Sequence, residues 1–174
     1  MTVFHILALS GSLRAASLNT AMLRMAQSCA PANVQLSVFE GLGDVPPFNP
    51  DLESDAPEAV LALDMAIRCA DAVLIASPEY AHGVSGVLKN ALDWMVSRAV
   101  LVDKPVALWN AAPRASHALA ALRETLEVMA SRLVASADLQ LLIKPPEPGQ
   151  QALNPDPLAM QAALLRLVGH QYTA

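Results

Sequence analysis

Short apolar segments alternate with amphipathic helical patterns along the sequence, and this alternation is the feature that most limits the possible folds. The apolar segments are typical of buried strands, and the helical patterns repeat apolar residues at spacings of three and four. Strands are expected at 3–9, 33–40, 71–77, 104–110 and 137–143. Helices are expected at 18–29, from about 55 to 70, at 85–98, at 119–133 and after Pro155.

A strand followed by a helix, repeated five times, predicts a parallel sheet with helices on both faces. Five strands favour the flavodoxin-like strand order over the six-stranded dinucleotide fold. We therefore expect an α/β protein, a three-layer α/β/α sandwich around a five-stranded parallel sheet. The 174 residues contain no internal repeat and no linker, so a single domain over 1–174 is expected.

Two local signals refine this scheme. The segment 41–52 is rich in Gly and Pro, which predicts a loop. Asp55 followed by Glu58 three residues later forms a capping-box pattern, which predicts that the second helix begins with Asp55 as its N-cap.

Composition and charge exclude several classes of protein. The net charge is −5 and no basic stripe is present, which argues against a nucleic-acid partner. No apolar run is long enough for a membrane span, and the first residues lack the positive region of a signal peptide. Cys29 and Cys69 lie in apolar helical patterns and are expected to be reduced, buried thiols, which favours the cytoplasm.

Three of the expected strands end in polar loops, at 10–19, 77–86 and 110–116. In the flavodoxin-like order these ends lie side by side. Ligands of such sheets bind beyond the carboxyl ends of the strands, near the switch in strand order. The three loops are therefore the expected site.

The first loop concentrates hydrogen-bond donors around one positive charge, namely Ser10, Ser12, Arg14, Ser17 and Asn19. Because the loop leads into a helix whose first N–H groups are free, a phosphate is the expected occupant. The loop matches neither GxGxxG nor a triphosphate loop, which favours a monophosphate. The alternative is an ordinary turn in which Ser17 is an N-cap and Arg14 is solvated.

The second loop is suited to a flat heterocycle. Pro78 fixes the backbone, Tyr80 offers an aromatic edge, and backbone N–H groups from Glu79 onward are expected to be free. Gly83 permits close approach. The alternative is a generic strand-to-helix loop with Ser85 as an N-cap.

These motifs carry a family resemblance. GSLRAASLN, VPPFNPDLE and PEYAHGVSGVLKNALDW together resemble the NADPH-dependent FMN reductase family, which includes quinone, chromate and azo reductases. The resemblance covers nearly the whole chain in order. It implies a flavodoxin-like fold, bound FMN, and a homodimer or homotetramer.

The resemblance also implies site residues. Ser10, Arg14, Ser17 and Asn19 match the family's phosphate loop, and Thr20 lies beside it. The residues that match the isoalloxazine loop are Pro78, Glu79, Tyr80 and Gly83, with His82 placed to touch the flavin. After the fourth strand many members have a glycine pair, whereas this chain has Ala111, Ala112, Pro113 and Arg114; flavin contacts are assigned there to Asn110 and Ala111.

The expected chemistry is hydride transfer from NADPH or NADH to bound FMN, followed by reduction of a quinone-like or other small acceptor in the same place. FMN carries this chemistry, so no catalytic side chain is expected. No pair of histidines shows metal-ligand spacing, so no metal is expected. The alternatives are a flavodoxin-type electron carrier and a flavin-binding redox sensor without turnover of its own.

Overall fold

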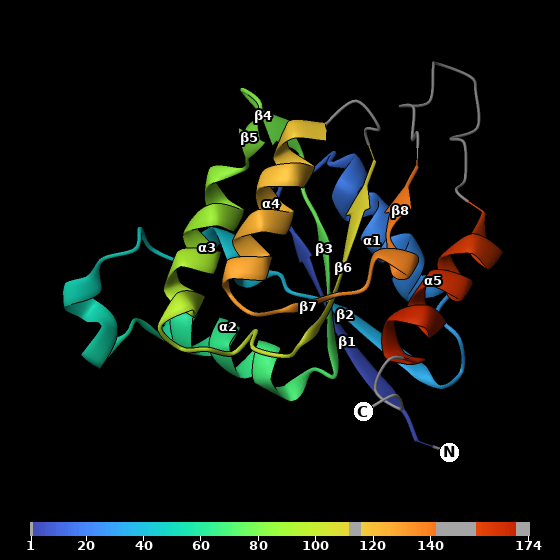
Figure 1. Cartoon of the computed structure of the whole chain (residues 1–174), viewed down its shortest axis with the longest axis horizontal. Coiled ribbons are helices and arrows are strands. Elements are labelled where there is room, and N and C mark those ends of the chain that lie inside the picture. The colour runs from blue at the N-terminus through green and yellow to red at the C-terminus, as the bar shows by residue number, and fades with distance from the viewer. Residues whose placement is uncertain (1, 112–115, 142–155, 170–174) are drawn as a thin grey trace.

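A computed structural model describes residues 2–111, 116–141 and 156–169. Its central sheet is parallel, with the strand order β2-β1-β3-β6 followed by β7 and β8, which both pair with β6 (Figure 1). The strands are β1 Phe4–Ser10, β2 Val34–Val38, β3 Ala72–Ala76, β6 Pro105–Asn110, β7 Arg132–Leu133 and β8 Leu139–Gln140. This is the predicted flavodoxin-like order, with the fifth strand in two parts.

Helices cover both faces of the sheet (Figure 1). The helices are α1 Leu18–Ser28, α2 Glu58–Cys69, α3 Gly86–Val96, α4 Ser116–Val128 and α5 Pro157–Gly169. Helices α1 and α5 pack on one face, and α2, α3 and α4 pack on the other. The predicted three-layer α/β/α sandwich is confirmed.

The central strands are apolar on both faces because both faces are buried. Ile6 of β1 lies opposite Leu36 of β2 and Ala72 of β3. Its side chain joins the core under α1 and α5, whereas that of the next residue, Leu7, joins the core under α2 and α3. This alternation fixes the register, since a slip of one residue would exchange the two cores.

The fifth strand was predicted as one segment over 137–143; β8 at Leu139–Gln140 lies within that range, but the strand is shorter than predicted and is preceded by a separate part, β7. β7 pairs with the start of β6, β8 pairs with its end, and the 3₁₀ helix Ala135–Ala137 interrupts them. Asp138 takes the place of the missing strand backbone, because its Oδ1 accepts the N–H of Leu108 at 2.7 Å. Its other oxygen pairs with Arg123 of α4. Residues 142 and 143 of the predicted strand lie outside the described residues.

Two helix predictions also need correction. The second helix begins at Glu58 with Pro57 as its N-cap, whereas Asp55 ends the 3₁₀ helix Pro50–Asp55, so the predicted capping box is wrong. Pro57 disfavours the helical conformation for the residue before it, which moves the start of the helix. Helix α4 ends at Val128, and Leu133 at the end of its predicted apolar stripe lies in β7 instead.

The loop after β2 is fastened to α3. Asn90 accepts the N–H of Phe48 at 2.7 Å and donates to the carbonyls of Val45 and Pro46, at 3.3 and 2.9 Å. Trp94, which is fully buried, donates Nε1 to the Pro46 carbonyl at 2.8 Å, and its ring meets that of Phe48 edge to face. The two motifs VPPF and KNALDW therefore form one structural unit, and Trp94 is a packing residue.

The two cysteines differ from the expectation of buried thiols. Both are free, but Cys69 is exposed and Cys29 is half-buried. Burial raises the pKa of the Cys29 thiol.

No helix in the described part of the chain is long and apolar enough to cross a bilayer.

Candidate functional site

A cavity of about 250 Å³ opens at the carboxyl ends of the strands, between the loop after β1 and the segment after β3. Its lining residues are Ser12, Arg14, Ala16, Ser17, Leu18, Asn19, Pro78, Glu79, Tyr80 and Ala111. The three polar loops singled out in the sequence therefore meet at this cavity, as the predicted strand order requires.

The other predicted site residues lie around this cavity without lining it. Ser10 and Thr20 line a neighbouring cavity on the β2 side of the loop. Asn110 is buried at the end of β6. His82 and Gly83 lie at the far end of the segment after β3, next to α4. Ala112, Pro113 and Arg114 lie outside the described residues.

Much of the polar chemistry of the first loop is already used within the protein. The Ser17 hydroxyl caps α1 by accepting the N–H of Thr20 at 3.2 Å, and the hydroxyls of Ser10 and Thr20 lie 2.7 Å apart. Asn19, which is buried, accepts the N–H of Ala111 at 3.1 Å and so ties the loop to the end of β6. These four side chains hold the shape of the loop.

Arg14 and Ser12 still have side-chain donors for a ligand, because the Ser12 hydroxyl only accepts a bond, from the Arg14 N–H at 3.4 Å. Within the described part of the chain, the guanidinium of Arg14 has no ion pair or hydrogen bond. The start of α1 stands beside it, and the first N–H groups of a helix favour an anion. Ser17 satisfies one of them, at Thr20. One cation, one hydroxyl and the remaining helix donors fit a monophosphate.

Gly11 is the point where the loop after β1 touches the segment after β3. A Cβ built on Gly11 would lie 2.5 Å from Ser77 Oγ and 2.8 Å from Ser85 Oγ. Its N–H donates to the carbonyl of Ala76 at 2.8 Å. A side chain at this position would therefore push apart the two loops that bound the cavity.

The segment after β3 folds into a tight hairpin, β4 Glu79–Tyr80 and β5 Gly83–Val84. The predicted run of free backbone donors is thus partly paired across the hairpin. Its two turn residues, Ala81 and His82, have φ values of 49° and 60°. A two-residue turn of this kind usually carries Asn-Gly, so both residues adopt a conformation that L side chains disfavour.

Helix α4 supports this hairpin (Figure 1). The Glu79 carboxylate accepts the N–H of Ala118 at 2.9 Å, so it caps the first turn of α4. The rings of His82 and His117 stack, with centroids 4.3 Å apart and planes 7° from parallel. Neither contact has a signal in the local sequence, because each joins residues more than thirty positions apart.

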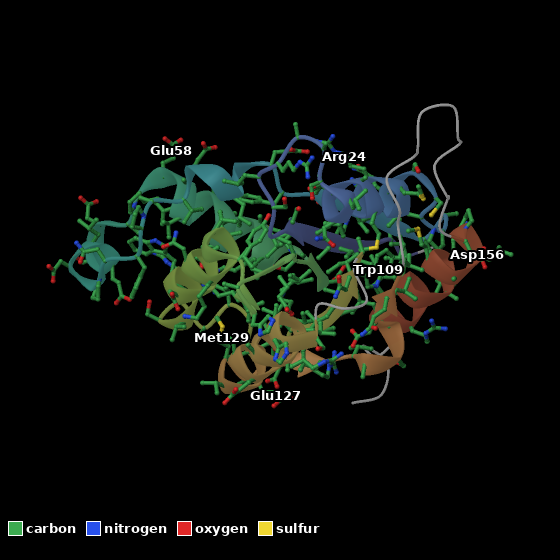
Figure 2. All side chains as sticks on the ribbon, turned by 90° about the horizontal axis from the view of Figure 1, so that it is seen from above. Arg24, Glu58, Trp109, Glu127, Met129 and Asp156 are labelled. Carbon is green, nitrogen blue, oxygen red and sulfur yellow. The ribbon has the colours of Figure 1, made fainter. Side chains whose placement is uncertain are left out.

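The end of the sheet that bears the cavity is seen in Figure 2, with Trp109 of β6 near the centre of the molecule and Arg24 of α1 toward the edge. Trp109 donates Nε1 to the carbonyl of Ala137 at 2.9 Å, which anchors the break in the fifth strand. Arg24 pairs with Glu40 at 3.4 Å, and both side chains are exposed. Arg14 and Arg24 are thus neighbouring cations of which only Arg24 has a carboxylate partner among the described residues.

A parallel sheet in this order, with a monophosphate-type loop at its switch point, defines a flavodoxin-like protein. The family model described as "NADPH-dependent FMN reductase" matches residues 4–143. The chain therefore belongs to the NADPH-dependent FMN reductase family. This confirms the resemblance carried by the sequence motifs and, with it, the oxidoreductase class, FMN and a nicotinamide electron donor.

Individual relatives agree with this placement. The chain is 37% identical over 143 residues to the "NADH:(hydroxy)cinnamate reductase subunit CrdA" of Vibrio ruber, a match that spans 79% of this chain and 70% of that protein. It is 39% identical over 105 residues to the "Quinone reductase" of Escherichia coli, spanning 59% of this chain and 54% of the relative. Among the solved structures, FerB from Paracoccus denitrificans, described as a "flavoenzyme NAD(P)H:(acceptor) oxidoreductase", aligns with a TM-score of 0.71 and 33% identity, covering 76% of each chain.

Proposed function

We propose that this chain passes hydride equivalents from NAD(P)H to a small quinone-like acceptor by way of FMN held in the cavity between the first loop and the hairpin. The observation that carries the proposal is the Arg14 guanidinium, which has no ion-pair partner among the described residues and lines a cavity whose other wall is the hairpin after β3. FMN, when bound, supplies the redox chemistry by accepting hydride and passing it on.

In this proposal the residues of the chain bind and orient. Arg14 and Ser12 hold the phosphate, and Ser10, Ser17, Asn19 and Thr20 keep the loop in shape for it. The residues assigned to the ring are Pro78, Glu79, Tyr80, Gly83, Asn110 and Ala111. His82 is assigned to the tip of the hairpin that forms this wall. No side chain is assigned a covalent or proton-transfer role.

Backbone N–H groups at the two neighbouring loops give the site its electrostatic function. Oriented N–H dipoles next to a reduced flavin stabilise the negative charge on its pyrimidine edge. The hairpin is fastened to α4 by the contact of Glu79 with Ala118, and the end of β6 is fastened to the first loop because the Ala111 N–H donates to Asn19. The dipoles that we assign to the flavin are the N–H groups that these contacts leave unused, and they need no rearrangement. Electrostatic preorganisation of this kind is the main contribution we assign to the protein.

Quinones are the acceptors most consistent with the relatives. The Escherichia coli relative is named a quinone reductase, and a Burkholderia relative that is 42% identical over 84 residues is named a "2-hydroxy-1,4-benzoquinone reductase". The Vibrio relative is named as a subunit of an NADH-dependent cinnamate reductase. An acceptor panel should therefore include 1,4-benzoquinone and a hydroxycinnamate.

The test is NADPH and NADH oxidation at 340 nm by the FMN-loaded protein, with and without each acceptor. We expect rapid bleaching of the flavin band by one of the two donors and its return on addition of benzoquinone. Rapid reduction excludes a passive electron carrier. Failure of both donors to reduce the bound flavin would exclude the proposed enzyme and leave a carrier or a redox sensor.

We also infer a single domain over 1–174, a cytoplasmic protein, and a homodimer or homotetramer. An assembly is supported by Leu61 and Met65, which lie one turn apart on α2 with 48% and 60% of their surface exposed. Contiguous exposed apolar surface marks sites of protein interaction, and these two neighbouring side chains are where we expect such a contact on α2. Light scattering after gel filtration measures the mass, and a monomer at micromolar concentration would contradict the assembly.

A further inference from the structure

The hairpin over 79–84 is a strained element at the edge of the proposed flavin site. Ala81 and His82 both hold positive φ values, and such residues persist only where surrounding contacts enforce them. Two strand residues on each side are too few to stabilise a hairpin alone. Contacts from elsewhere in the fold must therefore keep it in place.

Those contacts come from the first turn of α4. Glu79 at one end of the hairpin accepts the N–H of Ala118, and His82 at its tip stacks on His117. The two histidines are exposed, so burial of apolar surface does not account for their pairing. The near-parallel rings, with centroids 4.3 Å apart, are in direct stacking contact, slightly closer than the roughly 4.5 to 7 Å typical of aromatic pairs.

The same hairpin contributes the cavity wall. Glu79 and Tyr80 line the cavity directly, and Tyr80 pairs with Gly83 on the strand that follows the turn. A movement of the hairpin tip at His82 would therefore also displace Tyr80, which pairs with Gly83 and lines the cavity. The position of α4 and that of the flavin-facing wall are coupled through three residues, His117, His82 and Tyr80.

We propose that His82 and His117 are positioning residues for the flavin: their ring stack fixes the hairpin against α4 and so presets the wall of the cavity. This inference rests on the proposed function, since it concerns the same site. It assigns His82 a role through the hairpin and not as a ligand. It also assigns a role to His117, for which the sequence patterns indicate no function.

The two histidines are not interpreted as a metal site. The described residues contain no group of three or more potential ligands in reach of one ion. Stacked rings also direct their ring nitrogens sideways instead of toward one shared point. The two histidines therefore interact through the faces of their rings.

Three variants separate the effect of ring stacking from that of the ring nitrogens and from that of any substitution on α4. His117→Ala removes the ring, His117→Phe keeps a flat ring without ring nitrogens, and Glu127→Ala changes an exposed residue at the other end of α4 as a control. FMN dissociation constants follow from the quenching of flavin fluorescence in titrations of the FMN-free proteins. Thermal unfolding of each FMN-free protein reports whether the fold is intact.

We expect His117→Ala to raise the FMN dissociation constant about three- to tenfold. His117→Phe should restore binding to within about twofold of the wild type, because stacking needs only the ring. The unfolding temperatures should agree among all variants, since both rings are exposed. His82→Ala should match His117→Ala, and the double variant should lose no more than either single variant.

An unchanged FMN affinity in His117→Ala, or an equal loss in His117→Phe and His117→Ala, would overturn the positioning role. These outcomes differ from failure of the proposed function, which would appear as no FMN binding by the wild type. Additive losses in the double variant would also contradict a shared contact between the two rings.

Discussion

The loop after β1 and the hairpin after β3 face each other across one cavity, but different interactions shape them. In the loop, Ser17 caps the helix that follows and Ser10 pairs with Thr20 ten residues later, so most of the shape is set locally. The hairpin is held by Glu79 and His82 through residues of α4, more than thirty positions away. The phosphate-binding loop after β1 is thus shaped mainly by local contacts, whereas the hairpin that faces the ring is shaped by tertiary contacts with α4.

Removing the phosphate from the ligand tests the first side with the largest expected effect. Riboflavin keeps the ring and loses every charge-assisted hydrogen bond of the first loop, each of which is worth about 1.5 to 3 kcal/mol. We expect riboflavin to bind more than about 100-fold more weakly than FMN. Parallel fluorescence titrations measure both constants, and equal affinities would remove the phosphate from the loop.

Arg14→Ala should weaken FMN binding by about 1.5 to 3 kcal/mol, because a charged hydrogen bond to the phosphate is lost. Riboflavin binding should not change in this variant. Arg24→Ala is the matched control, since it removes the same charge from a neighbouring exposed side chain that pairs with Glu40. Retention of wild-type FMN affinity in Arg14→Ala would mean that its guanidinium points to solvent.

Gly11→Ala tests the contact between the two regions. Its Cβ would lie 2.5 Å from Ser77 Oγ, and overpacking of this kind costs about 1 to 3 kcal/mol of unfolding free energy. Gly86→Ala is the control, because a Cβ there meets nothing within 4 Å. Urea unfolding monitored by tryptophan fluorescence measures both, and an unaltered midpoint for Gly11→Ala would show that the loops can separate without cost.

Glu79→Gln should have the smallest effect of these variants, a small loss of stability confined to the start of α4. The amide oxygen still accepts the N–H of Ala118, but the negative charge at the start of α4 is lost, which costs about 0.3 to 1 kcal/mol of stability. If the Glu79 carboxylate acts only as a cap, and Glu79 meets the ring through its backbone, FMN affinity stays the same in Glu79→Gln. A marked loss of FMN affinity without a loss of stability would instead make the Glu79 side chain a direct flavin ligand.

The same contrast explains what could be predicted from the sequence. The strand order, the layers and the start of α1 follow from local periodicity and from Ser17, whose partner lies three residues on. The loop residues that gather at the cavity follow from the strand order. These features depend on patterns that lie within one element or at the end of a strand.

Other features depend on partners distant in the sequence. The break in the fifth strand is stabilised by Asp138, whose carboxylate reaches Leu108 and Arg123. The hairpin at 79–84 has no Asn-Gly signal, because α4 stabilises turn residues that the local sequence disfavours. Pattern reasoning has no access to such tertiary contacts.

A crystal structure of the protein with FMN would show directly whether the first loop holds the phosphate. We expect the phosphate within hydrogen-bonding distance of the Arg14 guanidinium and the Ser12 hydroxyl, with the ring between the first loop and the hairpin. A phosphate bound elsewhere, or a ring that leaves the cavity between Arg14 and Tyr80 empty, would contradict it.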